Sequence, residues 1–215
     1  MLGVKRLSVA VSLVVLGLAP AGAAYGTAAP SATPSAAASA QDKQFLQSIH
    51  QVNLAEIATG NLAQQKGASK EVKDLGARFV TDHTPMDQKV QSVASSAKVT
   101  LPNAPNTDQQ AVLKQLESIS GADFDAQWVT TQLTAHTQAM QGVQAELTKG
   151  SDPAVKEVAQ QTAPVLQAHH NALVAAAQTL GVPIPGGTTV APSPGASSKA
   201  PAPSGTSTAP GPTNS

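Results

Sequence analysis

Cysteine is absent from the 215-residue sequence, which excludes disulfide bridges, a thiolate nucleophile and thiolate metal ligands. A lipid-modified cysteine of the bacterial lipoprotein type is excluded for the same reason. Neither sign of charge is in excess, because 13 basic side chains are matched by 13 acidic ones, so we expect no nucleic-acid partner. Glycine-rich phosphate loops and nucleophile-elbow motifs are also missing.

The N-terminus has the pattern of an export signal. Lys5 and Arg6 precede an apolar run over residues 7–18, and the triplet "AGA" that ends at residue 23 fits a cleavage site. The run is shorter than the roughly 20 residues of a membrane-spanning helix, which disfavours the alternative of an uncleaved anchor. We therefore expect a signal peptide over residues 1–23. After its cleavage we expect an extracytoplasmic protein, secreted or in the cell envelope, without a membrane span.

Both flanks of the central region have low complexity. Residues 24–41 and 182–215 are rich in Ala, Ser, Thr, Pro and Gly, a composition that buries little apolar surface and predicts disorder. The first of these segments reads as a linker and the second as a tail, whose candidate contact is the cell wall or envelope. The folded domain is predicted over residues 42–181, and its other partners are unknown.

The central region reads as helices separated by capping residues and glycines. Apolar residues recur at helical spacing in four long stretches, no stretch alternates like a strand, and a shorter helix lies in the middle connection. The predicted helices cover residues 42–66, 69–98, 107–119, 123–149 and 153–180. Their capping signals are Ser39 with Asp42, Ser69, Thr107 with Gln110, Ser120 with Asp123, and Ser151 or Asp152 before Pro153. This pattern predicts an all-α, antiparallel four-helix bundle with one short extra helix in the crossover.

One strongly polar side chain interrupts the apolar stripe of each long helix near its midpoint. These four residues, the central polar layer, are Glu56, His83, His136 and His169. Helix midpoints meet at one level in an up-and-down bundle, so the four side chains are predicted to lie close together. Buried groups of this kind must bond to one another, hold water or hold a metal. Three imidazoles and a carboxylate match the ligands of mononuclear zinc, copper, iron or manganese, so the layer is a candidate metal site with a transition-metal ion as cofactor.

Two further side chains are candidates for this layer. Asp82 flanks the apolar stripe and is a candidate to orient an imidazole from behind. His170 replaces His169 as the inward residue if the helix register differs. We expect His50 to be a surface group and Asp125 to be a charge that favours the start of its helix.

Two prolines interrupt predicted helices. Pro85 and Pro164 each remove a backbone donor, so each is expected to kink its helix and to free a carbonyl near the central polar layer. Their alternative interpretation is simple tolerance near a helix turn.

Five stretches of this sequence, in order, resemble a known family. They are "AEIATGNLAQQKGASKEVKDLGARFVTDHT", "VTLP", "ISGADFDAQWV", "LTAHTQAM" and "APVLQAHHNAL". They resemble the secreted bacterial family called domain of unknown function 4142, whose members often carry the label outer membrane protein. The resemblance implies a ferritin-like four-helix fold and an extracytoplasmic location, and it implies no established activity. Its pattern includes Glu56, Asp82, His83, Asp125, His136, Pro164 and one of His169 and His170, while Trp128 stands where the family more often has tyrosine.

A di-iron centre is disfavoured by the spacing of acidic residues. Di-iron bundles carry a Glu-x-x-His motif on each of two helices. The residues three positions before the five histidines are Gln47, Val80, Leu133, Leu166 and Gln167, and none is acidic.

These observations favour an exported helical-bundle protein that is not an enzyme, in which the central polar layer serves fold specificity. The alternative is a mononuclear metal-binding bundle for sequestration, sensing or redox protection. A third hypothesis, an enzyme that uses His83 or His136 as a base, needs a cleft that reaches the layer.

Overall fold

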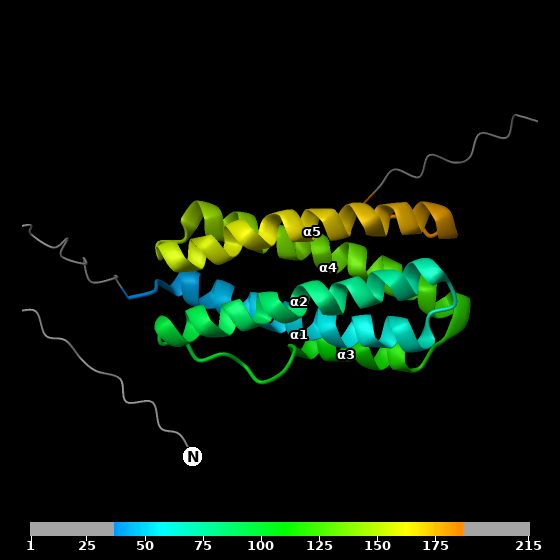
Figure 1. The fold of residues 1–215 in the computed structure, drawn as a ribbon, viewed down its shortest axis with the longest axis horizontal. Coiled ribbons are helices and arrows are strands. Elements are labelled where there is room, and N and C mark those ends of the chain that lie inside the picture. The colour runs from blue at the N-terminus through cyan, green and yellow to red at the C-terminus, as the bar shows by residue number, and fades with distance from the viewer. Residues whose placement is uncertain (1–36, 187–215) are drawn as a thin grey trace, which may run out of the picture. The chain divides into compact units, whose positions relative to one another are not determined.

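The computed structural model describes residues 37–186 (Figure 1). The predicted signal peptide and most of both flanking segments lie outside this range. The described part of the chain contains five helices: α1 (Ala40–Lys66), α2 (Lys70–Ser96), α3 (Thr107–Glu117), α4 (Gly121–Lys149) and α5 (Pro153–Leu180).

The four long helices form a bundle in which each helix is antiparallel to its two main neighbours. The end of α1 meets the start of α4 through a bridge between Gly67 and Gly121. The other end of α4 returns to the start of α1, where Ser151 donates hydrogen bonds to Asp42. As a result α1 packs against α2 and α4, and α5 packs against the same two helices from the other side (Figure 1).

The connection between α2 and α4 crosses back along the bundle and carries α3. This short helix packs outside α1 and α4 (Figure 1). The predicted all-α bundle with a short helix in its crossover is therefore confirmed. A single long crossover is also a feature of ferritin-like bundles, the fold that the family resemblance implies.

Most helix ends follow the predicted capping chemistry. Ser39 and Asp42 form the predicted capping box at the start of α1. Asp152 accepts hydrogen bonds from the first turn of α5. Pro153 occupies the first helical position, where a backbone N–H would have no partner within the helix, so proline costs no hydrogen bond there. Gly181 ends α5 in the left-handed conformation, with φ of 67°, which glycine adopts without steric penalty.

Two capping predictions were wrong. The capping box of α3 is formed by Asn106 and Gln109 rather than by Thr107 and Gln110. Asparagine is the stronger N-cap, so Asn106 takes the cap position and Thr107 becomes the first residue of the helix. Ser120 makes no side-chain cap bond at the start of α4. Its φ of −157° is far more extended than the −65° of the capping Ser39, so its hydroxyl is not placed over the first turn.

The apolar core is divided into two clusters by polar residues. One cluster is built around Phe45, Leu46, Val90, Val143 and Leu166. The other is built around Phe79, Trp128, Leu133 and Leu173. Along each long helix, the polar layer falls in the interval between these two sets. The buried polar groups therefore occupy the middle of the bundle, with apolar packing above and below them.

The helices α1 and α2 approach each other closely beside this layer. A Cβ atom added to Gly76 would lie 2.6 Å from the Gly60 carbonyl oxygen and 2.6 Å from the Ala63 Cβ. Glycine at position 76 thus allows the backbones of α1 and α2 to come together, which brings the polar side chains of α1 near those of α2.

Candidate functional site

Three histidines from three helices meet in the centre of the bundle. His83 comes from α2, His136 from α4 and His169 from α5, and each side chain is almost completely buried. One ring nitrogen of each lies within 4.8 Å of one ring nitrogen of each of the others. We call these three residues the histidine cluster. The ring of Phe79 stacks on His169, with 4.4 Å between ring centroids, and forms an apolar floor under the cluster.

The first histidine is oriented by an amide. His83 Nδ1 lies 2.9 Å from Asn53 Oδ1 on α1. An amide oxygen only accepts, so Nδ1 carries the hydrogen and donates it. In the neutral ring the other nitrogen, Nε2, then carries a lone pair, and this buried Nε2 has no hydrogen-bond partner in the described structure.

The second histidine is oriented by its own helix. His136 Nδ1 lies 2.9 Å from the backbone oxygen of Gln132, one turn earlier in α4. A carbonyl oxygen also only accepts, so Nδ1 donates and Nε2 carries the lone pair of the neutral ring. This Nε2 lies 3.4 Å from His169 Nδ1.

The third histidine is oriented by a carboxylate. His169 Nε2 lies 2.8 Å from Asp82 Oδ2 on α2. Asp82 is itself held 3.4 Å from Arg78 Nε, and about one third of its side chain is exposed. Because the carboxylate accepts from Nε2, the Nδ1 of a neutral His169 carries a lone pair. When both outer nitrogens donate in this way, the lone pairs of two neutral rings face each other across 3.4 Å.

Burial keeps the cluster uncharged. Desolvation, together with the other two imidazoles, lowers the pKa of His83 well below 6.5. Desolvation and His169 lower the pKa of His136 to about 3. Desolvation also lowers the pKa of His169, although the neighbouring Asp82 acts in the opposite direction. Three neutral imidazoles are the form in which histidine binds metal ions.

The fourth predicted member of the layer lies behind the cluster. Glu56 on α1 is buried, and its Oε1 is 3.8 Å from His136 Nδ1, the nitrogen that faces away from the other histidines. Its Oε2 has no hydrogen-bond partner in the described structure. Burial raises the pKa of Glu56 to about 8, although a hydrogen bond from Gln132 partly counteracts this. Glu56 is not among the residues whose ligand atoms lie within 4.8 Å of one another.

The helix register decides which of the alternative residues predicted from the sequence faces the core. His169 faces the core and the neighbouring His170 is partly exposed, so His169 is the inward residue. Asp82 contacts His169 from behind, the position expected of an orienting carboxylate. Pro85 and Pro164 both lie inside continuous helices, and both line a shallow groove outside Asp82.

The prediction that His50 is a surface group was wrong. His50 is 6% exposed, because the connection from α2 to α3 folds over this part of α1. Its Nδ1 lies 2.6 Å from Asp87 Oδ1, and its Nε2 lies 3.0 Å from the backbone oxygen of Pro102. Both partners are acceptors, so this ring serves to fasten the connection and does not join the histidine cluster.

Asp125 also has a role that the sequence did not indicate. Its two carboxylate oxygens accept the backbone N–H groups of Ala68 and Ser69, at 2.9 Å and 2.7 Å. It is buried and ties α4 to the turn between α1 and α2, so it is more than a favourable charge at the start of its own helix.

Asn53 and Gln132 were missed by the sequence reasoning. A signal for Asn53 was present, because it lies three residues before Glu56 and therefore on the same face of α1. Gln132 contributes its backbone oxygen to His136 and its side-chain amide to Thr59 Oγ1, at 2.6 Å. A backbone contribution of this kind leaves no trace in residue identity.

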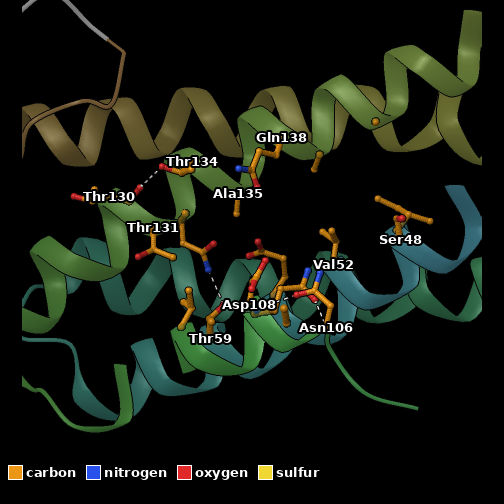
Figure 2. A pocket seen from close by; sticks show the side chains of 18 of the residues that line it. Ser48, Val52, Thr59, Asn106, Asp108, Thr130, Thr131, Thr134, Ala135 and Gln138 are labelled. Atoms are coloured by element: carbon orange, nitrogen blue, oxygen red, sulfur yellow. Dashed lines mark hydrogen bonds between the residues drawn. The ribbon is translucent and has the colours of Figure 1, made fainter. Parts of the chain in front are cut away.

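Two hollows border this region. A cavity of about 690 Å³ lies between α1, α3 and α4 and includes Glu56 in its lining (Figure 2). The shallow groove of about 420 Å³ lies between α2 and α5, where Asp82 and Arg78 line it. Neither of these two hollows is lined by a member of the histidine cluster. Among the described residues, no helix has the length and apolar character needed to cross a membrane.

Two solved structures share the arrangement of the helices. One is a DUF305 fragment from Deinococcus radiodurans, with a TM-score of 0.59 and 14% identity, covering 68% of this chain and 99% of that one. The other is described as a candidate secreted DUF305 protein from Streptomyces coelicolor, with a TM-score of 0.58 and 9% identity, covering 67% and 96%. At these identities the likeness concerns the fold alone. No curated protein matches the chain.

The family model described as Domain of unknown function (DUF4142) matches residues 27–179. The match includes all four helices of the bundle except the last residue of α5. The chain belongs to this family.

Proposed function

We propose that this member of the DUF4142 family is an exported protein that binds one transition-metal ion through His83, His136 and His169. The observation that carries the proposal is the orientation of the three rings. In each ring one nitrogen donates to an acceptor outside the cluster, and the other is left with a lone pair inside the bundle. Metal-binding histidines have this arrangement, with the non-ligating N–H fixed by a carbonyl or carboxylate.

The spacing of two of the nitrogens supports a single small ion, and a ring nitrogen of His83 lies within 4.8 Å of the other two rings' nitrogens. In a tetrahedral zinc site with Zn–N distances of about 2.0–2.1 Å, two ligand nitrogens lie about 3.3 Å apart. His136 Nε2 and His169 Nδ1 are 3.4 Å apart. A hydrogen bond is a poor explanation for this approach, because each of the two nitrogens carries a lone pair when its outer nitrogen donates.

The ligand set indicates the class of metal. Three imidazoles suit zinc and copper, whereas calcium and magnesium prefer oxygen ligands. The cluster contains no carboxylate ligand, which also distinguishes it from the glutamate-rich di-iron centres of ferritin-like bundles. We therefore propose Zn²⁺ or a copper ion as the occupant.

Two carboxyl groups stand outside the imidazoles and favour a cation. Asp82 contacts His169 Nε2, and Glu56 lies behind His136. A bound divalent ion would carry two positive charges into the bundle. Asp82 supplies one negative charge, and the ion would favour the ionised form of Glu56, whose pKa burial otherwise raises to about 8; neither group occupies a ligand position. The protein thus combines an uncharged ligand set with acidic groups behind two of its rings.

Binding without turnover fits the burial of the cluster. The three histidine side chains are at most 1% exposed, and neither hollow described above is lined by them. A substrate would need access to the metal, whereas sequestration or sensing needs only the ion. The export-signal pattern of residues 1–23 supports an extracytoplasmic setting for this activity, and the description of the similar Streptomyces protein as a candidate secreted protein is consistent with it.

The test compares neighbouring histidines on one helix. The full chain would be purified without a histidine tag, loaded with Zn²⁺ or Cu²⁺, desalted and analysed for bound metal by mass spectrometry. We expect one equivalent per chain, lost in His169→Ala and kept in the matched control His170→Ala. The same loss is expected in His136→Ala.

A metal-free chain that stays folded would overturn this proposal. The central polar layer would then serve fold specificity, and the protein would be a bundle that acts through its surface. Equal losses in His169→Ala and His170→Ala would likewise count against the cluster, because only His169 faces it. Circular dichroism of each variant separates loss of metal from loss of fold.

A further inference from the structure

The cavity between α1, α3 and α4 is a second site, separate from the histidine cluster. Its volume of about 690 Å³ lies in the range of cavities that hold small organic molecules. In Figure 2 Thr131 and Ala135 of α4 lie across the hollow from Val52 and Thr59 of α1, with Asp108 of α3 between the two helices.

The floor of this cavity contains an unused acceptor. Glu56 lines the cavity and is 3% exposed, and its Oε2 has no hydrogen-bond partner in the described structure. A buried carboxyl oxygen without a partner carries a penalty, which a ligand that donates a hydrogen bond would remove. Beside it, Gln132 Nε2 donates a hydrogen bond to Thr59 Oγ1.

The charge of the lining selects among possible ligands. Glu56 on the floor and Asp108 at the exposed rim are the acidic residues of the lining, and no Lys, Arg or His is among the lining residues. An anion would therefore meet two acidic residues and no basic side chain. Phe45, Ile49 and Val52 line the hollow with apolar surface, which suits a ligand with an apolar body.

We propose that this cavity binds a small organic amine, with the ammonium group donating to Glu56 Oε2 and the apolar body against α1 and α4. A compact aromatic or aliphatic body would pack against the apolar wall. The ammonium group would favour the ionised form of Glu56, whose pKa burial otherwise raises to about 8. This site does not depend on metal binding. The two sites meet at Glu56, whose other oxygen lies 3.8 Å from His136 Nδ1, and at Gln132, whose backbone oxygen lies 2.9 Å from the same nitrogen.

The experiment uses three probes of one shape and different charge. Benzylamine, benzyl alcohol and benzoate would each be titrated into the ¹⁵N-labelled full chain after treatment with a metal chelator, and amide shifts would be followed by NMR. We expect benzylamine to bind with shifts confined to α1, α3 and α4. Benzyl alcohol should bind about tenfold more weakly, and benzoate should not bind.

Three variants locate the effect. Glu56→Gln should weaken benzylamine binding by about tenfold or more, because the amide keeps the shape of the side chain but cannot ionise to pair with an ammonium group. Ala135→Leu, which fills the cavity from α4, should abolish binding of every probe. Asp74→Asn removes an exposed carboxylate of the Lys70 ion pair elsewhere on the surface and should leave binding unchanged.

Equal binding of benzylamine and benzoate would overturn the amine site, as would shifts that map outside the cavity. Unchanged affinity in both Glu56→Gln and Ala135→Leu would do the same. If Glu56→Gln fails to fold, Ala135→Leu and the comparison of the three probes still decide the result. Metal content measured on Ala135→Leu keeps this site distinct from the histidine cluster, because that variant should retain one equivalent of metal.

Discussion

Replacing Asp82 with asparagine tests whether the carboxylate behind His169 contributes to metal binding. Asp82 Oδ2 lies 2.8 Å from His169 Nε2, so it fixes the ring with Nδ1 directed away from it. The substitution keeps the size of the side chain and an oxygen that accepts, and it removes one negative charge. Because Asp82 is about one third exposed, the bundle should fold normally.

The expected size of the effect follows from this contact. Groups that orient metal-binding histidines typically contribute 10–100-fold to metal affinity, which corresponds to about 1.4–2.7 kcal/mol. Partial exposure of Asp82 screens its charge and places the expected loss near the lower end of this range. The broken pair with Arg78, 3.4 Å away and on the surface, should contribute little.

The assay is a competition titration with a chromophoric chelator at pH 7.5, on the wild type, Asp82→Asn and Asp74→Asn. Asp74 lies on the same helix in an exposed ion pair with Lys70, so it controls for loss of one surface charge. Metal affinity should fall about tenfold in Asp82→Asn and stay unchanged in Asp74→Asn. Equal affinity in the wild type and Asp82→Asn, or an equal loss in both variants, would refute the reasoning.

Three further predictions concern pH and stability. Because burial lowers the histidine pKa values, protons should displace the metal only below the ordinary histidine range; a titration of bound metal should stay flat from pH 8 to about pH 6.5, and loss within that interval would contradict this. Burial acts to raise the pKa of Asp42, but hydrogen bonds from Ser39 and Ser151 hold it below its ordinary value. The stability that ionised Asp42 gives the fold should therefore be fully present above about pH 4 and be lost in stronger acid. Asp42→Ala should lower the free energy of unfolding by about 3 kcal/mol, measured by urea unfolding at pH 7. Burial and a hydrogen bond to Asp42 raise the pKa of Glu146 to about 7, so the stability of the fold that depends on protonated Glu146 is fully present below pH 4.5 and is lost as pH rises through 7. Glu146→Gln should therefore raise the free energy of unfolding by about 2–3 kcal/mol at pH 8 and by almost nothing at pH 4.5. Equal increases at both pH values would exclude this cause.

The bundle was predictable because its local signals agree with its packing. Apolar residues at helical spacing, capping residues such as Ser39 and Asp152, and glycines such as Gly181 all mark the same boundaries. Asn106 and Thr107 are adjacent and both can cap a helix, and the prediction chose Thr107, which was wrong. The difference is a shift of one residue, which local spacing does not resolve.

The site was only partly predictable, because residue type and helical phase describe one helix at a time. Phase placed His83, His136 and His169 on inward faces, and equal depth along the helices suggested that they meet. Helical phase also predicted that His50 is exposed. This prediction was wrong, because the irregular connection after α2 covers His50, and the Pro102 carbonyl in that connection bonds to its ring. Glu56 was placed at the right level, yet it lies behind His136 rather than beside the other two rings.

The sequence by itself determined the helices, their inward faces and the level at which one carboxyl group and three imidazoles enter the core, because these depend on the periodicity of a single chain segment. Tertiary structure alone decided which nitrogen of each ring faces inward. That choice depends on acceptors from other segments or from the backbone, namely Asn53, the Gln132 carbonyl and Asp82. The convergence of three lone pairs is a property of the packed helices, and it turns a polar layer into a candidate metal site.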